Sequence, residues 1–203
     1  MEIIQLLRES QAMLEGHFLL SSGKHSDKYF QCAKLFQYPD KAKAAVEGLA
    51  NQIREDIKSG KLKVDVIAGP ALGGILPAWE LARQLNLPAI FTERDENGVM
   101  SLRRGFEIQS GTNVLIVEDV VTTGKSSKEC AQTLITSGAV ITALACIVDR
   151  RGKGELTANA SSAEIPWPIY PATVQNVASW EADVCELCKQ GVPLVKPGSR
   201  KVT

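Results

Sequence analysis

The sequence of 203 residues has no excess of charge of either sign and no long apolar run. Its 23 Lys and Arg residues balance 23 Asp and Glu residues, so no global field gathers nucleic acid or an anionic membrane surface. No apolar stretch reaches the ~18 residues of a membrane span. The start, MEIIQLLRES, lacks the basic-then-apolar order of a secretory signal. We therefore expect a cytoplasmic protein that binds neither nucleic acid nor membrane, and that holds any anion in a local site.

Cysteine and histidine are also scarce, with five and two residues. Three cysteines stand in mixed or apolar contexts that are typical of reduced core thiols, namely Cys32, Cys130 and Cys146. Cys185 and Cys188 form one C-x-x-C pair, which alone is a weak signal. A structural zinc ion needs about four ligands, and His17 and His25 lie far away in the sequence. The favoured interpretation of the pair is therefore buried or helix-surface thiols, with metal or redox work as the alternative.

Strand-like and helix-like segments alternate through the middle of the chain, which favours an α/β fold with a mostly parallel sheet. Apolar residues at steps of three or four predict a helix over 39–60. Its expected buried face holds Ala42, Val46, Leu49, Ile53 and Ile57. Strands are predicted over 63–68, 88–93, 113–119, 139–149 and, with prolines that restrict it to a sheet edge, 165–170. The length fits one domain with a small extension.

Polar residues fill the segment 93–105, whose Asn97-Gly98 pair predicts a hairpin or mobile turn. A further helix is expected between Gly124 and Gly138. Its inward-facing residues are predicted to be Ala131, Leu134 and Ile135. The tail from Pro193 looks irregular.

The most informative segment is 118–127, EDVVTTGKSS, which runs from the most apolar strand into this helix. Ligands of open parallel sheets bind beyond the carboxyl ends of the strands, and the unpaired N–H groups at a helix start suit a phosphate. Gly124-Lys125-Ser126 also matches the tail of the G-x-x-x-x-G-K-[ST] nucleotide loop. Asp119 stands where that loop needs its first glycine, which argues against an NTPase.

Glu118 and Asp119, the acidic pair, directly precede this cradle. Carboxylates accept hydrogen bonds from vicinal hydroxyls and stabilise oxocarbenium character, so the combination indicates a sugar phosphate. The alternative is that the acidic residues cap the following helix. Capping explains one of them but not both.

The segment 114–126, VLIVEDVVTTGKS, resembles the phosphoribosyl-diphosphate (PRPP) motif of type I phosphoribosyltransferases. The resemblance implies that the acidic pair holds the ribose hydroxyls and takes part in catalysis. It further implies a phosphate cradle made of Val120, Val121, Thr122, Thr123, Gly124, Lys125 and Ser126. Gly69 to Gly74, GPALGG, matches the family's short diphosphate loop, with Gly73 at the ligand; on its own this turn could equally serve packing.

Segment 16–30, the loop ending LRRGFEI and the closing KPGSR resemble orotate phosphoribosyltransferases within this family. The resemblance implies a type I phosphoribosyltransferase fold in a single domain over 1–203, with a hood formed mainly by residues 1–35. It implies transfer of a phosphoribosyl group from PRPP to orotate in pyrimidine biosynthesis. The alternatives are a purine phosphoribosyltransferase, or a non-catalytic nucleotide- or RNA-binding regulator on the same fold. The implied orotate-binding residues are Lys24, His25, Ser26, Thr122 and Arg150, with Tyr29 or Phe30 packing on the base; Arg151 is expected to be an exposed loop charge.

The chain departs from this family in the segment 93–105, which contains no lysine. Well-studied members carry lysines in the loop that covers diphosphate. Here Arg94 and Arg104 are the candidate catalytic cations, and Arg94 and Arg103 the candidate PRPP ligands. Arginine binds diphosphate oxygens bidentately but does not readily donate a proton at neutral pH, so the loop is expected to neutralise the leaving group. The family further implies Mg²⁺ held mainly through PRPP, without direct protein ligands, and a homodimer with shared sites.

Overall fold

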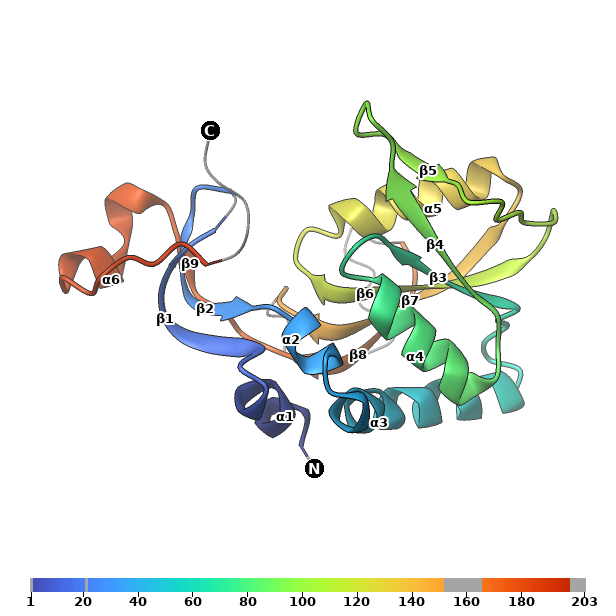
Figure 1. Ribbon diagram of the computed structural model, residues 1–203, viewed down its shortest axis with the longest axis horizontal. Coiled ribbons are helices and arrows are strands. Elements are labelled where there is room, and N and C mark those ends of the chain that lie inside the picture. The colour runs from blue at the N-terminus through green and yellow to red at the C-terminus, as the bar shows by residue number, and fades with distance from the viewer. Residues whose placement is uncertain (1, 21, 152–165, 198–203) are drawn as a thin grey trace.

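The computed structural model describes residues 2–20, 22–151 and 166–197, which build a central sheet and a smaller hood sheet (Figure 1). The central strands are β3 (Val66–Pro70), β4 (Ala89–Arg94), β5 (Met100–Leu102), β6 (Asn113–Val121), β7 (Val140–Asp149) and β8 (Ile169–Val174). Their order is β5-β4-β3-β6-β7-β8. All neighbouring pairs are parallel except β4 and β5, which form an antiparallel hairpin. The expected mostly parallel sheet and the hairpin around Asn97-Gly98 are confirmed.

Three helices cover the two faces of this sheet: α3 (Pro39–Lys58), α4 (Ile75–Leu85) and α5 (Lys125–Thr136). Strand β6 is buried on both faces, as its apolar sequence predicts. Its Leu115 and Val117 join the core that contains residues of α3 and α4, whereas Val114 and Ile116 join the core that contains residues of α5. The central strand is therefore fixed from both sides, which holds its carboxyl end in place.

Helix α3 confirms its predicted apolar face, with one partial exception. Its buried residues include Ala42, Val46, Leu49 and Ile53, and Ile57 is partly buried against the same core. In α5, Ala131 and Leu134 are buried as expected, but Ile135 is 45% exposed. The inward orientation predicted for Ile135 was wrong, because only one stripe of a helix on the outside of a sheet faces the core.

The bounds of strands β3, β6 and β8 differ from those predicted. Strand β3 begins at Val66 rather than at Lys63. Strand β6 runs on to Val121, so the acidic pair lies within the strand rather than at its end. Strand β8 lies at the edge of the sheet, as its prolines predict, although it spans Ile169–Val174 rather than 165–170.

The hood contains a three-stranded antiparallel sheet in the order β1-β2-β9. Its elements are α1 (Ile3–Glu9), β1 (Met13–Leu19), β2 (His25–Phe30), α2 (Ala33–Phe36), β9 (Ser179–Trp180), the 3-10 helix η1 (Ala182–Val184) and α6 (Glu186–Lys189). Residues far along the chain thus complete it. The apparently irregular tail is bonded to β1, because Val195 N–H donates to the His17 carbonyl at 2.8 Å and the Val195 carbonyl accepts from Leu19 N–H at 2.9 Å. None of the described helices is long and apolar enough to cross a membrane.

Candidate active site

The acidic pair meets the start of α5 at the carboxyl edge of the sheet. The Glu118 side chain is buried, and its Oε2 accepts a hydrogen bond from Ser127 Oγ in the first turn of α5 at 2.9 Å. The Asp119 Oδ1 accepts a hydrogen bond from Val120 N–H at 2.8 Å. Each carboxyl group is therefore oriented by a donor from its own strand or from the following helix.

Burial makes both carboxyl groups hard to ionise. It raises the pKa of Glu118 to about 8, with the charge of Asp119 adding to the rise and the Ser127 hydrogen bond opposing it. Burial also raises the pKa of Asp119, against the hydrogen bond from Val120. Adjacent carboxyl groups with raised pKa values are typical of functional sites. A cationic or hydroxyl-bearing ligand can stabilise the carboxylate form of such groups when it binds.

The loop 69–74 packs directly against this pair. A Cβ on Gly73 would lie 2.7 Å from Asp119 Oδ1, so Gly73 leaves the space beside the carboxylate open. A Cβ on Gly74 would lie 2.7 Å from the Val117 carbonyl oxygen, and one on Gly69 would lie 2.3 Å from that of Gly74. Packing alone therefore explains Gly69 and Gly74, whereas Gly73 borders the site. The peptide bond between Ala71 and Leu72 is cis.

The turn before α5 leaves its first amides available. Gly124 has φ 70° and precedes the helix, and no side chain caps it among the described residues. The first bond of the helix is that from Lys128 N–H to the Gly124 carbonyl, at 2.9 Å. Thr122, Thr123 and Lys125 are exposed around this turn. An uncapped helix start with hydroxyls and an ammonium group beside it is suited to a phosphate dianion.

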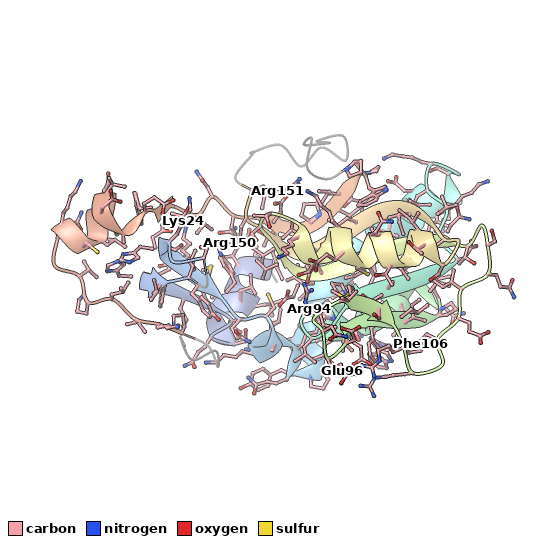
Figure 2. The ribbon with its side chains drawn as sticks, turned by 90° about the horizontal axis from the view of Figure 1, so that it is seen from above. Lys24, Arg94, Glu96, Phe106, Arg150 and Arg151 are labelled. Atoms are coloured by element: carbon pink, nitrogen blue, oxygen red, sulfur yellow. The ribbon has the colours of Figure 1, made fainter. Side chains whose placement is uncertain are left out.

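Arg150 lies where the end of β7 meets the hood (Figure 2). Its backbone N–H donates to the Val121 carbonyl at 2.9 Å, and its guanidinium lies 5.7 Å from the Phe30 ring centroid and 3.5 Å from Ser26 Oγ. The buried Nε has no hydrogen-bond partner. Burial lowers the pKa of Arg150, with Asp27 opposing the shift. No carboxylate of the described segments lies within ion-pair distance of Arg150. A partly buried cation whose buried Nε is an unused donor is suited to an anionic ligand.

The structure places the other hood residues differently. The His25 ring is buried and turned toward His17, with 2.9 Å between His25 Nδ1 and His17 Nε2. Lys24 forms an ion pair with Glu181 at 2.8 Å. Ser26 Oγ lies 3.0 Å from the Lys28 and Ala178 carbonyls. Of the three hood residues expected to bind orotate, Lys24, His25 and Ser26, only Ser26 has its side chain next to that of Arg150.

Two of the three arginines in the segment 93–105, Arg94 and Arg104, form ion pairs with glutamates. Arg94 forms an ion pair with Glu129 of α5 and donates to the Gly98 carbonyl at 2.7 Å. Arg104 pairs with Glu93 at 2.9 Å. Glu129 is one helical turn beyond the start of α5, about 6 Å along the axis, so Arg94 lies close to the turn before this helix. Arg103 lies on the same exposed segment, and its charge helps to lower the pKa of Glu93.

Two further residues shape this edge. Arg151, expected to be an exposed charge, has a side chain only 14% exposed that pairs with Asp149 at 2.6 Å. That expectation was wrong, because Asp149, the last residue of β7, lies close enough to form an ion pair with the Arg151 side chain. Cys32 Sγ lies 3.9 Å from the Asp119 carbonyl oxygen. Burial raises the pKa of Tyr29, and the charge of Asp119 adds to the rise. Spacing in the sequence gives no signal for these contacts between the hood and β6.

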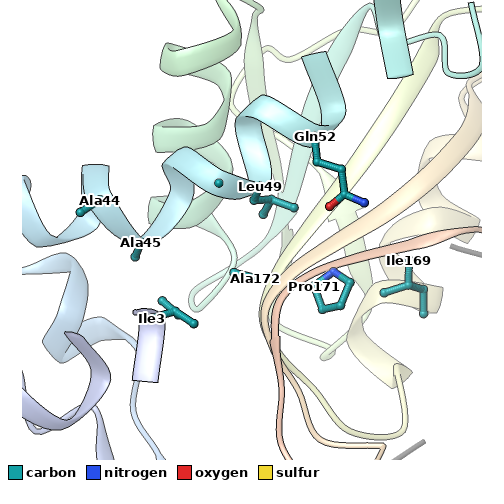
Figure 3. A pocket seen from close by; sticks show the side chains of 9 residues that line it. Ile3, Ala44, Ala45, Leu49, Gln52, Ile169, Pro171 and Ala172 are labelled. Atoms are coloured by element: carbon teal, nitrogen blue, oxygen red, sulfur yellow. The ribbon is translucent and has the colours of Figure 1, made fainter. Parts of the chain in front are cut away.

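A cavity of about 370 Å³ lies elsewhere, between α1, α3 and β8 (Figure 3). Its lining is Ile3, Ala44, Ala45, Gly48, Leu49, Gln52, Ile169, Pro171 and Ala172. None of these residues belongs to the acidic pair, the α5 turn or the Arg150 region. The cavity also holds no charged side chain, so it offers no chemistry of its own.

Comparison with known proteins agrees with this geometry. The family model of the phosphoribosyl transferase domain matches residues 37–167. The chain is 47% identical to an orotate phosphoribosyltransferase of Caldicellulosiruptor saccharolyticus over 98% of this chain and 96% of that one. Among solved structures, Leishmania donovani UMP synthase matches with a TM-score of 0.69 and 25% identity, over 85% of this chain and 36% of that chain. An Aeropyrum pernix orotate phosphoribosyltransferase matches in fold with a TM-score of 0.66 and 23% identity, over 85% and 93% of the two chains.

The chain has a mostly parallel sheet, and its central strand β6 carries the acidic pair next to the uncapped start of α5. This fold and site define the class of type I phosphoribosyltransferases. The matched family model covers this whole unit, from α3 to the end of β7. Within that class, the chain belongs to the orotate phosphoribosyltransferase family.

Proposed function

We propose that the protein transfers the phosphoribosyl group of PRPP to N1 of orotate, giving orotidine 5′-monophosphate and diphosphate in the cytoplasm. The observation that carries the proposal is Arg150, a partly buried cation whose buried Nε is an unused donor, beside the strand end that holds the acidic pair. An anionic base bound there would lie next to a sugar held by Asp119. Family membership supports the same reaction.

For PRPP, we assign the ribose hydroxyls to the acidic pair and the 5′-phosphate to the turn at 120–126. The phosphate would accept hydrogen bonds from the first amides of α5 and from Thr122 and Thr123, with Lys125 and Ser126 at the rim. The diphosphate would lie along the loop 69–74, where Gly73 leaves room beside Asp119.

Mg²⁺ fits this edge as an ion carried largely by the substrate. The described residues form a metal-capable cluster only in the hood, not beside the acidic pair, whose two carboxyl groups would gain from a nearby cation. Mg²⁺ commonly binds substrate phosphates and keeps few protein ligands. When bound, the ion neutralises charge on the diphosphate leaving group.

In the reaction, the bond between C1′ and the diphosphate oxygen breaks, the bond from C1′ to orotate N1 forms, and the proton of N1 passes to the departing diphosphate or to solvent. The carbon gains positive character on the way, and the negative charge of Asp119 stabilises it. Arg94, Arg103 and Arg104 would neutralise the departing diphosphate. Arg94 and Arg104 would first exchange their glutamate partners for diphosphate, which a moving hairpin allows. In a homodimer with shared sites, this hairpin would serve the neighbouring subunit.

For orotate, we assign Arg150 and Ser26, with Phe30 as the packing ring and Thr122 at the junction with the sugar. His25 is not proposed as a ligand, because its ring is buried toward His17. Lys24 would reach the base only by leaving Glu181. A purine base lacks the carboxylate that would use the free donor of Arg150, which favours orotate over the purine alternative.

The test is an absorbance assay in which purified protein, PRPP and Mg²⁺ are mixed with orotate, adenine or hypoxanthine in parallel. We expect loss of orotate absorbance and no product from either purine. In D119N, we expect turnover to fall about a hundredfold or more, the scale of losing a transition-state charge partner. An exposed change on α3, E47Q, is the matched control and should leave the rate unchanged. Near-normal turnover of folded D119N would contradict the role of Asp119, and consumption of a purine in place of orotate would contradict the substrate.

A further inference from the structure

Four potential metal ligands meet in the hood, away from the acidic pair: His17, His25, Cys185 and Cys188. His17 comes from β1 and His25 from β2, whereas Cys185 lies between η1 and α6 and Cys188 lies within α6. Figure 1 shows α6 at the outer end of the hood, on the side away from α5. The two histidines are far from the C-x-x-C pair in the sequence, but the fold places all four side chains close together. We propose that these four residues bind one structural zinc ion.

The distances fit tetrahedral coordination. The His17 Nε2 lies 3.4 Å from Cys185 Sγ and 3.7 Å from Cys188 Sγ, and His25 Nδ1 lies 3.3 Å from Cys188 Sγ. The two nitrogens are 2.9 Å apart, and all four ligand atoms lie within 4.8 Å of one another. Zn–N bonds of about 2.05 Å and Zn–S bonds of about 2.3 Å place nitrogen and sulfur about 3.6 Å apart and two nitrogens about 3.3 Å apart. Binding an ion at the centre would bring the most widely separated of these atoms closer by about 1 Å.

The orientation of His17 is set by a contact outside the cluster. Its Nδ1 lies 2.8 Å from the Val192 carbonyl oxygen, which only accepts hydrogen bonds, so Nδ1 carries the proton. In the neutral ring, Nε2 then presents a lone pair to the cluster. A carbonyl that fixes the tautomer of a metal-binding histidine is a recurrent feature of such sites.

The choice of zinc follows from the ligand set and its burial. His17, His25 and Cys185 are only 2%, 5% and 1% exposed. Two thiolates neutralise a divalent ion, which reduces the cost of burying it there. Two imidazole and two thiolate ligands in tetrahedral geometry are typical of structural zinc, because hard cations prefer oxygen.

The structural role of the ion would be to hold the segment 181–197 in place. Cys185 is its only buried residue, so the segment has almost no hydrophobic core of its own. Strand β9, just before it, pairs with β2 at two positions only, His25 with Trp180 and Ser26 with Ser179. Segments with so little buried apolar surface commonly need a metal or disulfide to hold them. The ion would join this segment to β1 and β2.

The test measures metal directly and does not depend on the enzymatic activity. Full-length protein without a histidine tag is purified under reducing conditions, and its zinc content is determined. We expect about one zinc ion per chain. After removal of zinc, added Co²⁺ should give the visible bands of tetrahedral cobalt and a thiolate charge-transfer band. The exposed position allows C188S without loss of folding, and this variant should lose zinc and the thiolate band. C130A, which removes a buried thiol of α5 outside the cluster, is the control and should keep both.

A reduced wild-type protein that contains no zinc and takes up neither Zn²⁺ nor Co²⁺ would overturn the proposal. So would full zinc retention in both C185S and C188S, or a disulfide between Cys185 and Cys188 in the purified protein. Hydrogen exchange tests the structural role separately. Zinc removal should accelerate amide exchange in β1, β2 and 181–197 but not in β6 and β7; equal acceleration everywhere would refute the local role.

Discussion

Replacing Glu118 by glutamine removes a buried titrating group while keeping its shape. Residue Glu118 is 9% exposed, and its carboxyl group lies beside Asp119 and accepts a hydrogen bond from Ser127. Its pKa rises from 4.5 to about 8, chiefly through burial. The amide of glutamine has similar volume and can accept the same hydrogen bond from Ser127. The variant therefore separates ionisation from packing.

The sign of the expected effect follows from the direction of the pKa shift. Between about pH 4.5 and 8 the unfolded chain has lost the Glu118 proton, whereas the native protein retains it. Unfolding then releases a proton, so this group makes the free energy of unfolding fall by about 1.36 kcal/mol per pH unit. Over the whole interval the loss amounts to about 5 kcal/mol as an order of magnitude, and it levels off above the native pKa. The contribution of the Glu118 proton to stability is fully present below the pKa of this group in the unfolded chain, about 4.5.

The assay is urea unfolding of wild type and E118Q, measured at intervals from pH 5 to 9. We expect the difference in free energy of unfolding to move in favour of E118Q as the pH rises, and to be largest at pH 8 to 9. E47Q, at an exposed site on α3, should track the wild type at every pH. Parallel curves for wild type and E118Q would refute the claim that burial holds a proton on Glu118.

Further predictions concern the diphosphate loop and the base site. In G73A the new Cβ would lie 2.7 Å from Asp119 Oδ1, so we expect a raised KM for PRPP in a folded protein. G48A, at a helical position with open space around it, is its control and should gain about 0.5–1 kcal/mol of stability by urea unfolding, with kinetics unchanged. In R150Q we expect the KM for orotate to rise about 10- to 100-fold, the scale of lost charge-assisted hydrogen bonds, with little change in the KM for PRPP. Unchanged constants in either active-site variant would remove that residue from the proposed site.

The centre of the fold follows from local sequence because each of its elements is specified by its own residues. The apolar side chains of β6 can be buried on both faces of the strand only if helices cover both faces of the sheet. The position of the turn before α5 can be predicted from its glycine and hydroxyl residues. The positions of the acidic pair and of the turn before α5 were accordingly predictable. The exact end of β6 was not, because pairing with β7 continues past Asp119 to Val121.

The hood could not be predicted to the same extent because long-range contacts decide it. Nothing near His25 in the sequence indicates that its ring meets Cys188, and so its assignment to orotate rested on the motif alone. The same holds for Arg151, whose burial depends on Asp149. Spacing arguments work within one element, whereas these side chains are placed by the packing of different elements.

The pairing of His25 with Trp180 also fixes the order in which the protein can fold. Closing a loop of roughly 150 residues costs about 4 kcal/mol of chain entropy, whereas the central strands pair over much shorter separations. During synthesis, residues 66–127 leave the ribosome well before 179–197. The acidic pair and the turn before α5 can therefore form on a nascent chain whose hood is still incomplete, and refolding followed through Trp180 should show a phase later than that of the sheet.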